Sequence, residues 1–195
     1  NDPALRSQIE ELENLEIEEE QSMRVQPCLS PVWDTSQSLV TLLETDLPND
    51  HDALQKAGEW LLDREVEESG DLAIVAPDVP LGGWYFEYNN EFYPDTDDTA
   101  EILYGLNQLR FDSEEKEEER TAAIDRGLSW LLAMQNSDGG WAAFDKDCDN
   151  EVLTYVPFAD HNAMIDPSHV DLTGRIVQML AAFGYDRNDP PVRQA

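Results

Sequence analysis

The chain has 195 residues, the length of about one domain, and 41% of them are hydrophobic, so it can bury a core. It carries 43 acidic and 12 basic residues, a formal net charge of −31. Nucleic acids and anionic membranes attract basic surfaces, so this charge argues against both of them as electrostatic partners.

The first segment of the chain is polar and rich in glutamate. From Asn1 onward it has none of the apolar core of a signal peptide. Apolar residues are sparse in SQIEELENLEIEEEQ, residues 7–21, so the pattern predicts a weakly amphipathic helix or a linker. The chain contains no run of about 18 apolar residues, which a membrane-spanning helix would need.

Three segments of similar pattern follow. They are DTSQSLVTLL from Asp34, DTAEILYGL from Asp98 and DLTGRIVQML from Asp171, and in each an apolar residue stands five and eight positions after the aspartate. Aspartate is a common N-terminal cap because its carboxylate accepts backbone N–H groups that a helix leaves unpaired. The pattern therefore predicts three helices, each capped by its aspartate.

A second helix type alternates with the first. KAGEWLLDRE (residues 56–65) and RGLSWLLAMQ (residues 126–135) both place a basic residue four positions before Trp-Leu-Leu. The charge run DSEEKEEER, residues 112–120, precedes the second, and we expect it to be a solvated loop leading into that helix. Two alternating helix types that recur about every 65–75 residues indicate an all-α fold, an (α/α) barrel or toroid with one type inside and the other outside.

Strand signals are few. The aromatic segment GGWYFEYNNEFYP, residues 82–94, could form a short hairpin across Asn89–Asn90. This segment is too isolated to change the predicted fold class.

Three aspartates crowd into DTDD, residues 95–98, at the start of the second Asp-type helix. If these helices form the inner ring, their N-termini point into one end of a central cavity. Three carboxylates in a poorly hydrated place cannot all ionise, so we expect at least one to keep its proton at neutral pH, as a general acid must. The alternative is that Asp98 only caps the helix and the other two face water.

A metal site is a second interpretation of the aspartate cluster. Such clusters bind Mg²⁺, usually together with a substrate phosphate, but no phosphate-binding glycine loop is present and basic residues near the cluster are few. FDKDCDNE, residues 144–151, resembles the start of an EF-hand, yet Asn150 and Val156 stand where that loop needs glycine and glutamate. We therefore expect no calcium there.

The histidines and cysteines show no metal-ligand spacing. His51, His161 and His169 are expected to be surface or loop residues. Cys28 and Cys148 are too few for a disulfide framework, so a reducing compartment is the default expectation.

Aromatic side chains gather near the acidic cluster and near the starts of the Asp-type helices. Core packing is the ordinary explanation for each of them. Together with an acid they would suit another chemistry, because an acid in a dry cavity can protonate an alkene and aromatic faces can stabilise the resulting cations. The residues concerned are Trp33, Trp84, Tyr85, Phe86, Tyr88, Phe92, Tyr93, Trp130, Trp141 and Phe144.

The motif DTDDTA, residues 95–100, resembles the DxDDTA signature of squalene–hopene cyclases. RGLSWLLAMQNSDGGW, residues 126–141, is similar at every defined position to the QW motif that this family repeats. The likeness extends from about Val25 to the C-terminus and includes SPVWDT, GGWYFEYNNEFYP and YVPFADHNAMIDPSHVDLTGR. KAGEWLLDRE…SGDL resembles a degraded QW motif, with Glu65 in place of Gln and Leu72 in place of Trp.

The resemblance implies a pair of (α/α) barrels and an acid-initiated polycyclisation of squalene to hopene or hopanol, with no cofactor and no metal. Asp97, the central aspartate of the motif, is then the proton donor, flanked by Asp95 and Asp98. Residues 1–28 would be a linker or the tail of the preceding barrel domain, and residues 29–195 the N-terminal half of the catalytic one.

Five further positions gain a role from the resemblance. Trp33, Phe86 and Phe144 match positions that line the cavity and stabilise cations, although some members carry Tyr in place of Phe144. Asp171 matches a residue that supports the acid, and Arg175 stands where some members carry a histidine bonded to it. A fixed positive charge there should stabilise the aspartate left after proton transfer, which strengthens the acid.

Three other interpretations are open. Oxidosqualene cyclases typically carry Cys where this chain has Asp98, which favours squalene over its epoxide. Class II diterpene cyclases share the acid motif but bind a diphosphate. A non-catalytic helical toroid used for protein binding would have no need for both the acid cluster and the aromatic lining.

Partners and location follow from the same resemblance. We expect squalene as the lipid substrate, no nucleic acid, and a homodimer as a candidate assembly. We expect the full-length protein to attach to the cytoplasmic side of a bacterial membrane, as a peripheral or monotopic protein, through segments that this chain lacks. The last residues, NDPPVRQA, resemble the start of a further helix, so we expect a piece of a longer protein.

Overall fold

The structure is a computed structural model of the chain. It describes residues 3–19, 21–26, 29–68, 70, 72–88, 90–157 and 164–195. Three residues named in the sequence predictions, Cys28, Asn89 and His161, lie outside these ranges. The chain divides into two compact units, Asn1–Ser30 and Pro31–Ala195, a division two residues away from the predicted domain boundary.

The first unit consists of one helix and a small hairpin. Helix α1 spans Pro3–Asn14, and strands β1 (Glu16–Glu18) and β2 (Met23–Val25) pair antiparallel, with Ile17 opposite Arg24. The hairpin is not predicted from the sequence, because each strand has only three residues and β1 contains two glutamates, which are rare in strands. The assignment of this unit to the tail of another domain stays a prediction.

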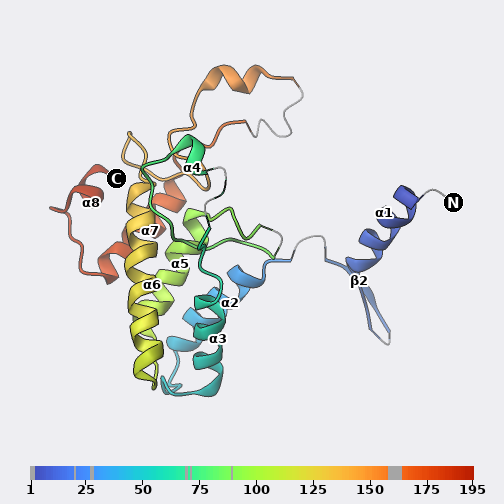
Figure 1. Cartoon of the computed structure of the whole chain (residues 1–195), viewed down its shortest axis with the longest axis horizontal. Coiled ribbons are helices and arrows are strands. Elements are labelled where there is room, and N and C mark those ends of the chain that lie inside the picture. The colour runs from blue at the N-terminus through green and yellow to red at the C-terminus, as the bar shows by residue number, and fades with distance from the viewer. Residues whose placement is uncertain are drawn as a thin grey trace. The chain divides into compact units, whose positions relative to one another are not determined.

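The second unit is a stack of helices in two layers (Figure 1). Helices α2 (Pro31–Leu43), α5 (Thr96–Gln108) and α7 (Val170–Ala182) lie in one layer, with α5 between the other two. Helices α3 (Asp52–Leu62) and α6 (Glu114–Ala133) form the other layer, in which α3 packs on α2 and α6 packs on α5. The all-α fold and the alternation of two helix types are therefore confirmed.

Three short elements complete the second unit. They are α4 (Leu72–Val75), the 3-10 helix η1 (Glu151–Tyr155) and α8 (Pro190–Gln194). None of the helices in the described ranges has both the length and the apolar character that crossing a bilayer requires.

The hydrophobic core lies between the two layers. The apolar positions of the repeated Asp-type pattern pack into it, because a spacing of three residues places them on one face of each helix. One of them, Leu42, is only partly buried. The others are buried and are Leu39, Leu103, Leu106, Ile176 and Met179.

Two buried tryptophans make the same contact in successive repeats. The indole N–H of Trp141 donates to the carbonyl of Leu131 at 2.8 Å, and that of Trp84 donates to the carbonyl of Leu61 at 2.7 Å. Each acceptor is the first leucine of a Trp-Leu-Leu segment, and each donor follows two glycines. The resemblance places the tryptophan of the degraded motif at Leu72. In the structure this contact is made instead by Trp84, twelve residues further along the chain.

The charge run at residues 112–120 is helical from Glu114 onward, so the prediction of a loop is wrong for most of its length. Helix α6 begins at Glu114, and the Ser113 side chain caps it by accepting the backbone N–H of Lys116. Acidic residues suit this first turn because the positive end of the helix dipole lies there.

The aromatic segment at residues 82–94 does not form a ladder in its described part. Trp84 makes single antiparallel bridges with Glu65 and Asp95, and turns and irregular backbone fill most of the remainder. The described part of the segment therefore forms a loop whose ends are joined by the bridge between Trp84 and Asp95, and the predicted turn residue Asn89 lies outside the described ranges.

Candidate active site

Asp95 caps the N-terminus of α5. Its Oδ1 accepts the backbone N–H of Asp97 at 3.1 Å and that of Asp98 at 2.8 Å. The predicted capping role of Asp98 is therefore wrong, and so is that of Asp34 and Asp171, which lie inside the first turns of α2 and α7. These three carboxylates still benefit from the positive end of a helix dipole.

Two contacts fix this N-terminus in the fold. The N–H of Asp95 donates to the carbonyl of Trp84 at 2.9 Å. Thr96 is fully buried and donates its hydroxyl to the carbonyl of Ala142 at 2.7 Å and its N–H to that of Ala143 at 2.9 Å. The acidic cluster is thus tied to the two loops that carry the buried tryptophans.

A cavity of about 330 Å³ adjoins the start of α5. Small-molecule sites commonly have volumes of about 300–1,000 Å³. Most of the predicted site residues line this cavity, together with Ala143, His169 and Leu172. They are Trp33, Phe86, Asp95, Asp97, Asp98, Phe144 and Asp171. The remaining one, Arg175, is paired with Asp97.

Asp95 and Asp98 form a coupled pair of buried carboxyl groups. They are 3% and 1% exposed, so Asp95 does not face water as the capping alternative required. Burial raises the pKa of Asp98, and the charge of Asp95 raises it further. Burial also raises the pKa of Asp95, while hydrogen bonds from Asp98 lower it. Two buried carboxyl groups this close cannot both ionise, so the pair holds one proton at neutral pH.

Asp97 is the carboxyl group of the cluster that has a cation beside it. Arg175 Nη1 lies 2.7 Å from Asp97 Oδ1, in an ion pair that lacks the angles of a hydrogen bond. Burial raises the pKa of Asp97, Arg175 lowers it, and the charge of Asp171 raises it. Because Arg175 stabilises its anion, Asp97 is a stronger acid than Asp98.

Aromatic rings line this cavity, and one of them lies near the guanidinium of Arg175. The guanidinium carbon of Arg175 lies 5.5 Å from the centroid of the Trp33 ring, within the range of a cation–π contact. Phe144 stacks on Tyr93, with 5.5 Å between ring centroids and 22° between ring planes. Burial and the carboxylate of Asp145 raise the pKa of Tyr93 to about 12, so its hydroxyl stays protonated and donates to Asp145 at 3.2 Å.

Asp166 fixes the backbone of the loop that carries Phe144. Its Oδ2 accepts the N–H of Phe144 at 2.6 Å and that of Asp145 at 2.9 Å, and its Oδ1 accepts that of Ala143 at 3.3 Å. Three amides bound to one carboxylate restrain the loop, so the Phe144 ring keeps a defined place on the cavity wall.

Asp166 was not predicted as a site residue. Tyr93 was predicted only as one of the aromatic residues near the acidic cluster, and its hydrogen bond to Asp145, like the contacts of Asp166, joins residues at least twenty positions apart in the sequence. His169, expected to be a surface or loop residue, lies at the N-cap position of α7 and lines the cavity with a half-exposed side chain. His51 is exposed and caps α3, which agrees with its predicted surface position.

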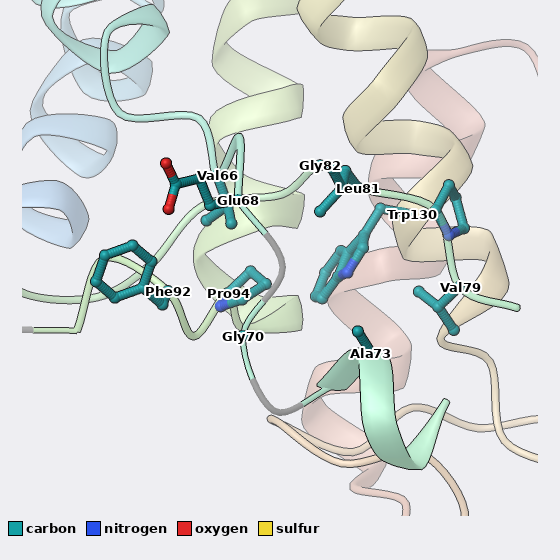
Figure 2. A pocket seen from close by; sticks show the side chains of 11 residues that line it. Val66, Glu68, Gly70, Ala73, Val79, Leu81, Gly82, Phe92, Pro94 and Trp130 are labelled. Carbon is teal, nitrogen blue, oxygen red and sulfur yellow. The ribbon is translucent and has the colours of Figure 1, made fainter. Parts of the chain in front are cut away.

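The described residues contain no candidate metal cluster, and an apolar hollow near Trp130 is too small for a substrate. Within the described ranges, no three His, Cys, Asp or Glu side chains are placed to hold a metal ion. A second hollow near Trp130, Phe92 and Pro94, lined mainly by apolar side chains, has a volume of about 30 Å³ (Figure 2). It has room for about one or two water molecules and not for a lipid.

Comparison with known proteins identifies the family. Residues 29–195 match the sequence model described as the squalene-hopene cyclase C-terminal domain. The chain belongs to the squalene–hopene cyclase family. It therefore shares the family's helical architecture, and the cavity described above lies within the matched residues.

Relatives in this family cover most of the chain. A squalene–hopene cyclase of Alicyclobacillus acidocaldarius is 41% identical over 170 residues, which are 87% of this chain and 26% of the relative. One from Bradyrhizobium diazoefficiens is 44% identical over 160 residues, 82% of this chain and 24% of the relative. A dammaradiene synthase of Dryopteris crassirhizoma is 40% identical over 179 residues, 92% of this chain and 26% of the relative. The chain thus spans about a quarter of the length of these relatives.

Proposed function

We propose that this chain supplies the proton-donating wall of a class II triterpene cyclase that acts on squalene. The observation that carries the proposal is the position of Asp97, a partly buried carboxyl group on an aromatic-lined cavity with a guanidinium beside it. Membership of the squalene–hopene cyclase family supports the same chemistry.

In the proposed reaction Asp97 donates a proton to a terminal carbon–carbon double bond of squalene. The new C–H bond leaves a tertiary cation, which the next double bond attacks to form a ring and a new cation. Loss of a proton from the last cation to solvent gives hopene, and addition of water followed by loss of a proton to solvent gives hopanol. A proton from solvent restores Asp97. Atoms and charge balance in this sequence, so it needs no oxidant, metal or cofactor.

The other side chains have distinct parts in this proposal. Arg175 stabilises the Asp97 anion and so makes the acid stronger. The rings of Trp33, Phe86 and Phe144 present negative π faces to the cations and help to exclude water. The proton shared by Asp95 and Asp98 stays in place, because their carboxyl groups are buried and have no cation beside them to stabilise the second negative charge.

Replacing Phe86 by alanine is expected to slow cyclisation about tenfold or more, or to release partly cyclised products. A ring beside a desolvated cation contributes about 1–2 kcal/mol, which corresponds to roughly a tenfold change in rate. The measurement is the rate and product spectrum of the whole protein with squalene. Phe92→Ala is the matched control, since Phe92 is half-exposed and outside the cavity. Hopene alone at the native rate from Phe86→Ala would reduce Phe86 to a packing role.

Chelation by EDTA is expected to leave squalene cyclisation unchanged, because protonation of an alkene requires no diphosphate ionisation. The whole protein would be assayed with squalene and with geranylgeranyl diphosphate, each with EDTA and with added Mg²⁺. Conversion of squalene alone, insensitive to EDTA, supports the proposal. Turnover of the diphosphate that EDTA stops and Mg²⁺ restores would instead assign a class II diterpene cyclase. Turnover of neither substrate would favour a non-catalytic toroid.

Product, location and assembly are further parts of the proposal. We propose hopene and hopanol as products. Because one relative is named dammaradiene synthase, a different product is the alternative, and analysis of the products formed from squalene is the test. We propose that the whole protein attaches to the cytoplasmic side of a membrane, because its proposed substrate is a lipid. The homodimer stays a prediction. Relatives in Dryopteris crassirhizoma and Schizosaccharomyces japonicus show that the family is not confined to bacteria.

A further inference from the structure

Glu101 is a second carboxylate near Arg175 that has no part in the mechanism above. It lies one helical turn after Asp97 on α5, and Arg175 lies one turn after Asp171 on the adjacent helix α7. The spacing of four residues places each pair on one face of its helix. Glu101 and Arg175 line the same small cavity, of about 110 Å³, between α2, α5 and α7.

We propose that Glu101 is a positioning residue, the counter-ion of Arg175 while Asp97 carries its proton. The inference rests on the proposed function, in which Asp97 must be neutral before the reaction and anionic after it. A guanidinium is charged throughout. A neutral Asp97 cannot balance that charge, so without another anion Arg175 would favour the ionised Asp97, which has no proton to donate.

The electrostatic surroundings support this role. Burial, the largest effect, holds the pKa of Glu101 above its ordinary value; Arg175 opposes this rise, Asp97 adds to it, and a side-chain hydrogen bond from Gln37 opposes it. The guanidinium and the Gln37 amide therefore both favour the charged form of Glu101. The negative charge of Glu101 also raises the pKa of Asp98.

The groups that face this region come from three helices. Helix α2 contributes the neutral side chains of Gln37 and Val40, and α7 contributes Asp171 and Arg175. The ionisable groups on α5 are Asp97, Asp98, Glu101 and Tyr104. Among these carboxylates, Glu101 is the one that lines the small cavity together with Arg175, and it takes no part in the proton transfer.

The experiment is the pH dependence of squalene cyclisation by the whole protein. The acid must be protonated, so activity is present at low pH and is lost as the pH rises through the pKa of Asp97. Glu101→Gln removes a negative charge, which favours the Asp97 anion. We expect this limb of the profile to move to lower pH by about one unit. Activity would fall about tenfold just above the native limb and recover on acidification.

Three further variants make the result specific. Glu101→Asp keeps the charge and is expected to keep a profile close to the native one. Glu118→Gln makes the same chemical change on the exposed face of α6 and is expected to change nothing. In an Arg175→Gln background, Glu101→Gln is expected to produce a smaller shift, because Glu101 acts through Arg175.

Two outcomes would overturn the inference and leave the proposed function intact. One is an active Glu101→Gln protein with the native pH profile. The other is an equal shift with and without Arg175, which would mean direct repulsion between Glu101 and Asp97. A native protein that does not cyclise squalene at any pH would overturn the proposed function itself, and the inference with it.

Discussion

Asp97→Asn is expected to lower squalene cyclisation by about a thousandfold or more in a whole protein that remains folded. The amide matches the carboxyl group in size and in hydrogen-bonding capacity, but it cannot release the initiating proton. The substitution also removes the anion that pairs with Arg175, at a partly exposed site. Product yield from squalene and a thermal melt of the same preparation are the two measurements.

Two matched variants separate the acid from its surroundings. Asp34→Asn makes the same change in the first turn of α2, at an exposed residue outside the cavity, and is expected to keep native activity. Asp98→Asn removes the proton shared with Asp95 and tests the other candidate donor. A native product yield from Asp97→Asn, together with an inactive and folded Asp98→Asn, would move the proton-donating role to Asp98.

Trp84→Ala is expected to destabilise the second unit by roughly 3–5 kcal/mol, the usual cost of removing a buried tryptophan. The indole is fully buried and hydrogen-bonded to the carbonyl of Leu61, which would lose this donor and keep the backbone N–H of Arg64. The backbone of Trp84 also accepts the N–H of Asp95, so the cap of α5 should loosen as well. The measurement is the denaturation midpoint of the whole protein.

Two further variants define what Trp84 contributes. Trp84→Phe keeps an aromatic ring but loses the indole N–H, so an intermediate loss of stability is expected. Tyr155→Ala removes a ring that is 84% exposed and is expected to cost no more than about 0.5 kcal/mol. A Trp84→Ala protein with a midpoint close to the native one would contradict the equivalence of Trp84 and Trp141 in the two repeats.

The sequence predicted the helices and their alternation because both depend on local pattern. Leu103 and Leu106 lie on one face of α5, and their spacing alone places them in the core. The start of α5 was harder to predict. Three aspartates stand within four positions, and which of them caps the helix depends on the bridge between Trp84 and Asp95, a contact between separate segments.

The candidate site was predicted largely from motifs, and the remainder depends on tertiary contacts. Asp97 and Phe86 stand in segments that resemble a known family, so they were found without a structure. Asp166 was missed because its three partners are backbone amides of residues 143–145. Every residue except proline has a backbone amide, so the residue types at these positions do not predict the contact. The contact of Trp84 with Leu61 was missed for a related reason, since a long insertion separates Trp84 from the repeat it completes.

Cyclisation of squalene in D₂O tests most directly whether Asp97 starts the reaction with a solvent-exchangeable proton. The native whole protein is expected to yield hopene that carries a single deuterium, at the alkene carbon protonated first, as mass spectrometry of the lipid extract would show. Asp97→Asn is expected to yield no labelled product. Cyclised product without deuterium, or labelled hopene at native yield from Asp97→Asn, would contradict initiation by this acid.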